Sequence, residues 1–227
     1  MRYENIKRGI FISRPNRFIA NVEIDGVNEV CHVKNTGRCG ELLIKGAQVL
    51  VQECDSETRK TKYDLISVYK GDTLVNMDSQ STNKAVHEFL QSGRLFKDIK
   101  LIKPEKKYKN SRFDFYVETE TDRIFIEVKG VNLEIDGVAL FPDAPTERGV
   151  KHIKELMECV RDGYKAYVIF VVQMGNVRYF MPNYKTHKEL GDTLKQAADS
   201  GVNVLAYDCH VTETDMTIRN EIEVCYA

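Results

Sequence analysis

The chain has 227 residues, of which 42% are hydrophobic and 30% are charged, and its formal net charge is −1 at pH 7. This length and composition allow one large or two small domains with a real hydrophobic core. The near-neutral charge excludes a globally basic nucleic-acid binder, so a basic surface has to be local.

No targeting or membrane segment is apparent in the sequence. No apolar run approaches the ~18 residues of a membrane span, and Met1-Arg2-Tyr3-Glu4 opens no signal peptide, so we expect a cytoplasmic protein without membrane contact. The six cysteines form no Cys-x-x-Cys pair, and reduced, mostly buried thiols are their ordinary state in the cytosol.

Residues 1 to about 75 favour β-structure. Strand-like segments stand at 9–12, 18–24, 30–33, 48–52 and 63–69, and Asp25-Gly26 is a hairpin signal between two of them. Short strands at this spacing predict a small barrel of the oligonucleotide-binding (OB) type over residues 1–78. Its loops carry Arg14 and Arg17, then Lys34 and Arg38, then Arg59, Lys60 and Lys62. If the loops converge they form a phosphate-binding face; otherwise these are solvated loop charges.

Residues 79–227 predict a mixed α/β sandwich. A helix from about residue 81 has Ala85, Val86, Phe89 and Leu90 on its apolar face and Glu88 at the margin of that face. A hairpin follows at 111–129, and Asp143 or Pro145 suits the start of a helix that runs to about Arg161. The nearly continuous hydrophobic segment 166–172 indicates a central strand buried on both faces.

The hairpin carries the residues with the clearest chemistry. Its first strand alternates Phe113, Phe115 and Val117 with Arg112, Asp114 and Tyr116, and its second places Glu127 and Lys129 on one face. Antiparallel pairing then brings Asp114, Glu127 and Lys129 together. Paired carboxylates suit Mg²⁺, and a nearby Lys can orient an attacking water. The alternative is an exposed, salt-bridged sheet face, since acid-x-Lys also occurs at 98–100 and 105–107.

The element order, with Asp114 and Glu127-Val128-Lys129 on neighbouring strands, resembles the core of the PD-(D/E)xK nuclease superfamily. Over nearly its whole length the chain is similar to the sugar fermentation stimulation protein A family. The matching segments are Arg17-Phe18, 35–38, 111–114, 125–129, 141–144, 148–152 and 170–173. Cys39 and Gly130 depart from the Met and Asn that the family pattern leads us to expect.

This resemblance implies an OB-type barrel followed by a restriction-endonuclease-like domain. It also implies a DNA partner and Mg²⁺-dependent phosphodiester cleavage, with Mn²⁺ as a substitute ion. Asp114 and Glu127 would bind the metal with Glu88 as a third carboxylate, and Lys129 would be the catalytic lysine.

The candidate nucleic-acid-binding residues are Arg14, Arg17, Lys34, Arg38, Arg59, Lys60, Arg112, Arg148, Lys151 and His152. One alternative is a non-catalytic DNA-binding regulator of sugar (maltose) metabolism on the same scaffold. A third interpretation is an RNA- or nucleotide-processing enzyme that uses the same ions. DNA strand preference stays open, as does the oligomeric state, with a dimer as one option.

Overall fold

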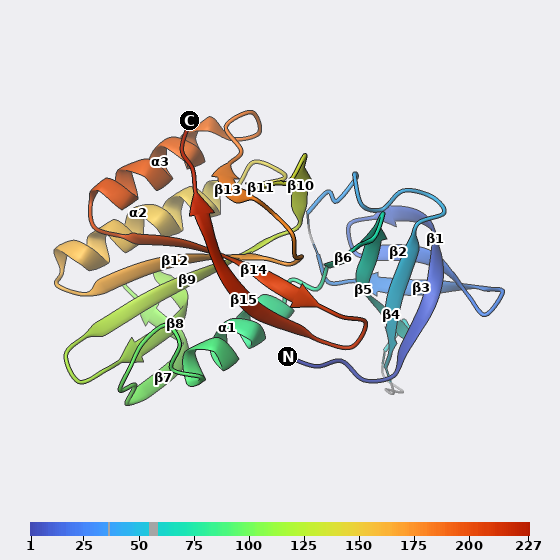
Figure 1. The fold of residues 1–227 in the computed structure, drawn as a ribbon, viewed down its shortest axis with the longest axis horizontal. Coiled ribbons are helices and arrows are strands. Elements are labelled where there is room, and N and C mark those ends of the chain that lie inside the picture. Colours follow the sequence, from blue (N-terminus) through green and yellow to red (C-terminus); the bar gives the residue numbers. More distant parts are fainter. Residues whose placement is uncertain (36, 55–58) are drawn as a thin grey trace.

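The computed structural model describes residues 1–35, 37–54 and 59–227, and Figure 1 shows a small barrel beside a larger layered part. The barrel strands are β1 (Ile6–Asn16), β2 (Ile19–Ile24), β3 (Val27–Val33), β4 (Gln48–Glu53) and β5 (Tyr63–Lys70), followed by the short β6 (Thr73–Asn76). Parallel pairing of β3 with β5 closes the sheet into a barrel, which confirms the predicted OB-type fold. Thr36, within the segment 35–38 that matched the family, lies outside the described residues.

The larger part is a nine-stranded sheet with helices on both faces, as the sequence predicted (Figure 1). Its strand order is β10-β11-β13-β15-β14-β12-β9-β8-β7. These strands are β7 (Leu101–Tyr108), β8 (Ser111–Glu118), β9 (Arg123–Val131), β10 (Leu133–Ile135), β11 (Val138–Phe141), β12 (Lys165–Val172), β13 (Tyr179–Pro182), β14 (Asn203–Val211) and β15 (Met216–Val224). The helices are α1 (Ser81–Gln91), α2 (Glu147–Arg161) and α3 (Lys188–Asp199).

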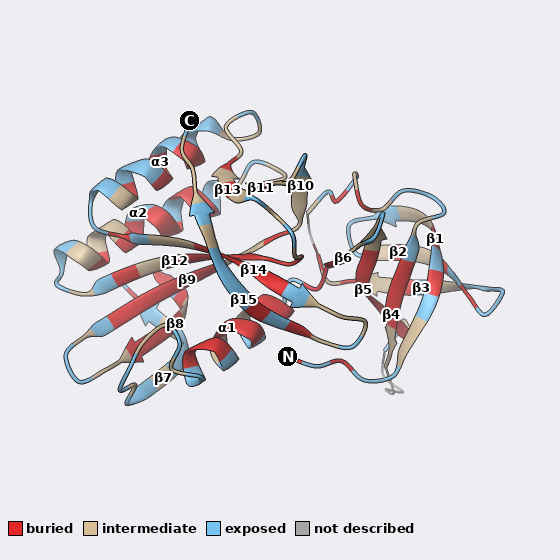
Figure 2. Ribbon diagram, in the orientation of Figure 1, coloured by how far each residue is buried: buried red, intermediate tan, exposed pale blue. Residues whose placement is uncertain are grey.

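Two apolar clusters hold the helices on the sheet. Val150 and Ile153 of α2 and Leu190 of α3 pack in one cluster with Phe125 and Phe170. Val86 and Leu90 of α1 pack in the other cluster with Ile126 and Ile169. The strand β12 contributes to both clusters and is almost entirely buried, because β9 and β14 flank it in parallel (Figure 2).

The hairpin β8–β9 departs from strict alternation at one point. Phe113 packs against Phe125 on the α2 side, whereas Phe115 stacks on His87 of α1. Residues two apart in a regular strand share a face, so the prediction that Phe113 and Phe115 lie on the same face is wrong. The pairing of β7 with β8 omits Asp114, which lies between Phe113 and Phe115.

The helix α2 begins at Glu147, just after the predicted start at Asp143 and Pro145. Its N-cap is Thr146, whose Oγ1 accepts the Gly149 N–H at 3.1 Å, so Asp143 is not the capping residue. The Asp143 carboxylate instead accepts the backbone N–H of Arg38 at 2.7 Å, across from the barrel. Asp143 therefore ties a barrel loop to the larger part.

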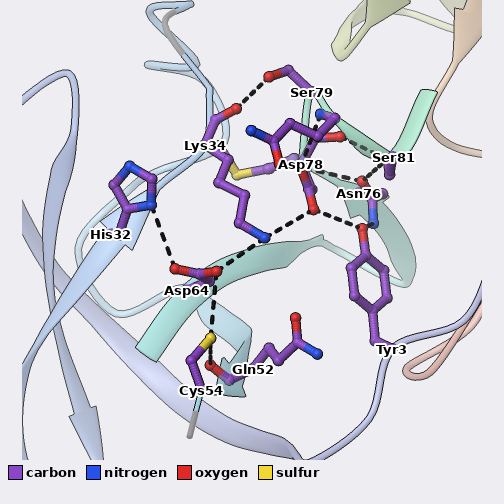
Figure 3. A network of polar contacts seen from close by, with 12 residues as sticks. Tyr3, His32, Lys34, Gln52, Cys54, Asp64, Asn76, Asp78, Ser79 and Ser81 are labelled. Carbon is purple, nitrogen blue, oxygen red and sulfur yellow. Dashed lines mark hydrogen bonds and ion pairs between the residues drawn. The ribbon is translucent and has the colours of Figure 1, made fainter. Parts of the chain in front are cut away.

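A polar network joins the barrel to the larger part. In Figure 3 the Lys34 ammonium lies between the carboxylates of Asp64 and Asp78, at 2.9 and 3.3 Å. Beyond it, the Gln173 amide that follows β12 donates to Asn76 Oδ1 at 2.8 Å and to the Asp78 carbonyl at 3.0 Å. Because these groups are buried and mutually satisfied, they fix the barrel against the sheet.

No helix among the described residues is long and apolar enough to cross a membrane.

Candidate active site

The strands β8 and β9 place Asp114 where their backbone pairing ends. Pairing runs from Glu118–Arg123 to Phe115–Ile126, and Asp114 is the next residue of β8. Its Oδ2 accepts the Val128 N–H at 2.7 Å, and its Oδ1 accepts the Asn83 side-chain amide of α1 at 2.8 Å. The Asp114 side chain therefore replaces a ladder hydrogen bond and is held in one orientation.

Glu127 is the most deeply buried acid of this cluster, at 3% exposure. Its Oε1 lies 2.5 Å from Lys129 Nζ and 2.5 Å from His152 Nδ1 of α2. Its Oε2 is buried and has no hydrogen-bond partner among the described residues. A buried ionised oxygen without a partner is costly, and a bound cation is one way to satisfy it.

The electrostatics of the two carboxyls differ. Burial raises the pKa of Glu127, but the His152 hydrogen bond and the Lys129 ammonium outweigh burial, so its pKa is lowered from 4.5. Burial and the neighbouring Glu127 charge raise the pKa of Asp114 above 3.8, against the Val128 and Asn83 hydrogen bonds. The pair thus resists holding two negative charges, which a cation between them would relieve.

His152 was predicted to hold phosphate, but the structure directs its ring at Glu127. The ring is 5% exposed, and its Nε2 lies 3.4 Å from Arg148 Nε. Since Arg148 can only donate, Nε2 accepts and the Nδ1 proton points at Glu127. His152 therefore orients the Glu127 carboxylate and leaves Oε2 free.

Glu88 does not join this cluster. Its carboxylate pairs with the amino group of Met1 at 2.6 Å, and its side chain is 55% exposed. The Met1 amino group also donates to the Met216 carbonyl of β15 at 2.9 Å. The contact that α1 makes with Asp114 comes from Asn83 instead, so Glu88 is not retained as a metal ligand.

Three of the predicted phosphate-binding residues are engaged inside the protein. Arg14 donates to the carbonyls of Arg17, Asn35, Gly37 and Arg38, and so organises the loop after β3. Lys34 and Arg59 both form ion pairs with Asp64, which is 1% exposed. These three side chains already have partners within the protein, and their predicted role in nucleic-acid binding stays a prediction. Lys60 is exposed.

Two hollows flank the cluster. A cleft of about 830 Å³ lies between the barrel and the larger part, lined by Arg17 and Arg38 on one side and by Gly130, the residue after Lys129, on the other. A second hollow of about 710 Å³ is lined by His152 and by Lys107, Arg112, Arg148 and Lys151. Arg112 forms an ion pair with Glu105 at 2.7 Å, while Arg148 and Lys151 are exposed. One opening thus borders the residue after Lys129, the other borders His152, and both carry basic side chains.

A different group of potential ligands, Glu147, His187 and Glu189, has its ligand atoms within 4.8 Å of one another. However, His187 Nδ1 accepts the Thr146 N–H at 3.3 Å, so the neutral ring carries its proton on Nε2. That proton points at Glu147, 3.4 Å away, and Lys154 pairs with Glu189 at 2.9 Å. This group is therefore satisfied as a set of hydrogen bonds and ion pairs.

The sequence analysis did not identify Asn83 or Lys107 as site residues, and it predicted phosphate binding for His152, whose ring contacts Glu127. Asn83 lies two positions before the apolar face of α1 begins, and nothing local marks it as a partner of Asp114. His152 lies beside Ile153 on α2, at the margin of the apolar face formed by Val150, Ile153 and Leu156, and this position could have indicated that its ring is buried.

Comparison with known proteins agrees with this architecture. Residues 12–77 match the SfsA N-terminal OB domain, and residues 80–215 match the sugar fermentation stimulation protein RE domain. The chain is 63% identical to a sugar fermentation stimulation protein homolog of Clostridium beijerinckii and 62% identical to one of Ruminiclostridium cellulolyticum, in each case over 99% of both chains. It also matches the structure of Pyrococcus furiosus SfsA in complex with Ca²⁺, with a TM-score of 0.91 and 30% identity over 99% of this chain and 97% of that one.

Proposed function

Because the chain belongs to the sugar fermentation stimulation protein family and carries a buried pair of carboxylates beside a lysine, we propose that it binds nucleic acid and hydrolyses phosphodiester bonds with a divalent metal ion. The observation that carries this proposal is the unpartnered Oε2 of Glu127 beside Asp114. A salt-bridged surface has no reason to bury such an oxygen.

The residues present fit Mg²⁺ or Mn²⁺. Asp114 and Glu127 offer hard oxygen ligands, and Mg²⁺ usually takes one or two carboxylates and completes its shell with water and substrate phosphate. When bound, the ion would neutralise phosphate charge and lower the pKa of a bound water. The complex of the Pyrococcus furiosus relative with Ca²⁺, another hard cation with oxygen ligands, supports this choice.

The chain's own side chains have separate tasks in this proposal. Asn83 and the Val128 N–H fix Asp114, and His152 fixes Glu127. Lys129 uses one of its three donors on Glu127, which leaves two for the attacking water and for a phosphate oxygen. An ammonium at this position stabilises the negative charge that develops on the phosphate in the transition state.

Substrate phosphates would lie along the second hollow. Lys107, Arg148 and Lys151 are exposed there beside His152, so their ammonium and guanidinium groups can neutralise a nucleic-acid backbone next to the scissile bond. In this proposal the binding charge lies on α2 and β7, near the cluster, and the barrel residues that already have partners within the protein contribute less.

A second candidate is a DNA-binding regulator without cleavage. The name of the relatives, sugar fermentation stimulation protein homolog, refers to an effect on sugar metabolism and not to a nuclease. The contacts of Glu127 Oε1 with Lys129 and His152 also form without a metal ion, so they are compatible with a retired site.

Cleavage assays separate the two candidates. Purified protein is incubated with end-labelled single-stranded DNA, duplex DNA and RNA in Mg²⁺, Mn²⁺ or chelator, beside an Asp114→Asn variant. We expect metal-dependent cutting by the wild type and none by the variant. Binding without cutting under every metal would leave the regulator, and cutting that survives in Asp114→Asn would place the chemistry elsewhere.

A further inference from the structure

The turn between β1 and β2 presents an aromatic side chain to solvent. Phe18 is 51% exposed, and no other aromatic residue among those that the structure describes is classed as exposed. Single exposed apolar side chains are ordinary on protein surfaces, so exposure alone assigns no partner to Phe18. What marks this ring is its place beside the exposed Arg17, because proteins that bind single strands combine aromatic rings for the bases with basic side chains for the backbone.

The turn that carries Phe18 is firmly held. The Phe18 N–H donates to Asn16 Oδ1 at 2.9 Å, and the Phe18 carbonyl accepts the Val33 N–H at 2.8 Å. The Arg14 guanidinium also holds the Arg17 carbonyl at 2.9 Å. The exposure of the ring is therefore a property of the ordered turn and not of a frayed end.

The same turn borders the cleft that leads to the candidate active site. Asn16 and Arg17 line the cleft from the barrel side, Arg38 lines it from the next loop, and Gly130 lines it beside Lys129. A Cβ at Gly130 would lie 2.8 Å from the Gln173 side chain, so the absence of a side chain lets this wall pack closely. A chain laid along the cleft from Arg17, the neighbour of Phe18, thus reaches Gly130, the residue after Lys129.

The charge of the cleft favours a single strand over a duplex. The exposed cations Arg17 and Arg38 share it with the carboxyls of Glu41 and Asp143. Two cations offset by two acids suit a strand with few phosphates and offer little to the dense charge of a duplex. Stacking of unpaired bases on aromatic rings supplies affinity that does not depend on charge.

We propose that this turn and cleft bind single-stranded nucleic acid, with Phe18 stacking on an unpaired base and Arg17 and Arg38 contacting the phosphates beside it. This inference rests on the proposed function and adds the substrate class: a strand with unpaired bases at the point where it enters the site.

Fluorescence anisotropy in chelator, where no metal-dependent cutting occurs, tests the stacking. The probes are a labelled single-stranded oligonucleotide, the same strand with one abasic position, and a duplex. We expect Phe18→Ala to weaken single-strand binding by about 5- to 150-fold, the usual range for loss of one stacked base. Phe18→Trp should restore binding, and Val27→Ala, which alters a side chain 57% exposed on another barrel turn, should leave it unchanged.

The abasic strand distinguishes stacking by Phe18 from a role of Phe18 in the structure of the turn. The wild type should lose affinity for the strand when the stacked base is absent, and Phe18→Ala should then cause little further loss, because both changes remove one interaction. Equal single-strand affinity of the wild type and Phe18→Ala would overturn the proposal.

A metal-dependent cleavage assay on the duplex separates this inference from the proposed function. If Phe18→Ala cuts each substrate as fast as the wild type does, and binds single strands as tightly, the stacking role is wrong and the proposed nuclease function is retained. If the wild type neither binds nor cuts any nucleic acid, both fail together.

Discussion

Replacement of Lys129 with methionine should lower the rate of metal-dependent phosphodiester cleavage by about 10²–10³-fold, the usual cost of losing one preorganised donor to a developing negative charge. Methionine keeps an unbranched side chain of similar volume and lacks the ammonium, which lies 2.5 Å from Glu127. Single-turnover cleavage of an end-labelled oligonucleotide measures the effect, because it isolates chemistry from product release.

Lys100→Met is the matched control for this experiment. Asp98-Ile99-Lys100 has the same acid-x-Lys spacing, but Lys100 pairs at 3.2 Å with the exposed Glu120, whose side chain is 64% exposed. Cleavage by Lys100→Met should equal that of the wild type. We expect Lys129→Met to fold, because His152 still forms its hydrogen bond with Glu127. A urea titration checks this. A folded Lys129→Met protein that cuts at the wild-type rate would remove Lys129 from the mechanism.

Asp64→Asn should lower the free energy of unfolding by about 3 kcal/mol at pH 7, as expected when one partner of a buried ion pair is removed. Asp64 is 1% exposed and accepts from Lys34 at 2.9 Å (Figure 3). It also forms an ion pair with Arg59. The low end of the usual ~3–5 kcal/mol range applies because Lys34 keeps Asp78 and Arg59 can turn to solvent. Urea unfolding measures the change.

The effect of Asp64 should depend on pH in a defined direction. Burial raises the pKa of Asp64, but Arg59 and Lys34 outweigh burial, so its folded-state pKa lies below the ordinary 3.8. A carboxyl with a lowered folded-state pKa stabilises the protein above its unfolded-state pKa, and this stability is lost as the pH falls through the folded-state value. The difference in the free energy of unfolding between the wild type and Asp64→Asn should therefore be largest above about pH 5 and should decrease below pH 4.

Asp72→Asn, at an exposed turn, is the control and should have the same free energy of unfolding as the wild type. A decrease in Asp72→Asn equal to that in Asp64→Asn would show that Asp64 has no special role.

The parts of this structure that the sequence predicted depend on local patterns. Alternation along 123–129 indicated that Glu127 and Lys129 share a face, and the continuous hydrophobic segment 166–172 indicated a strand buried on both sides. Antiparallel pairing across the hairpin at 111–129 indicated that Asp114 lies beside Glu127. In each case residues close together in the sequence determine the answer.

The parts that were missed depend on contacts between segments far apart in the chain. Whether an arginine binds phosphate or a protein carbonyl cannot be read from its own loop: Arg14 is engaged by carbonyls up to 24 residues away, while Arg17 lines the cleft. Glu88 and Asn83 stand on one helix, and only the positions of Met1 and Asp114 decide which of them reaches the cluster. The strand β15 pairs antiparallel with β14 and lies within the sheet, although it comes last in the sequence.

Direct metal binding tests the central claim that Asp114 and Glu127 form a cation site. Isothermal titration calorimetry with Mn²⁺ compares the wild type with Asp114→Asn, Glu127→Gln and Lys129→Met in the absence of nucleic acid. We expect saturable binding by the wild type and by Lys129→Met and its loss in both carboxylate variants. Absence of binding by the wild type, or equal binding by all four proteins, would contradict the account.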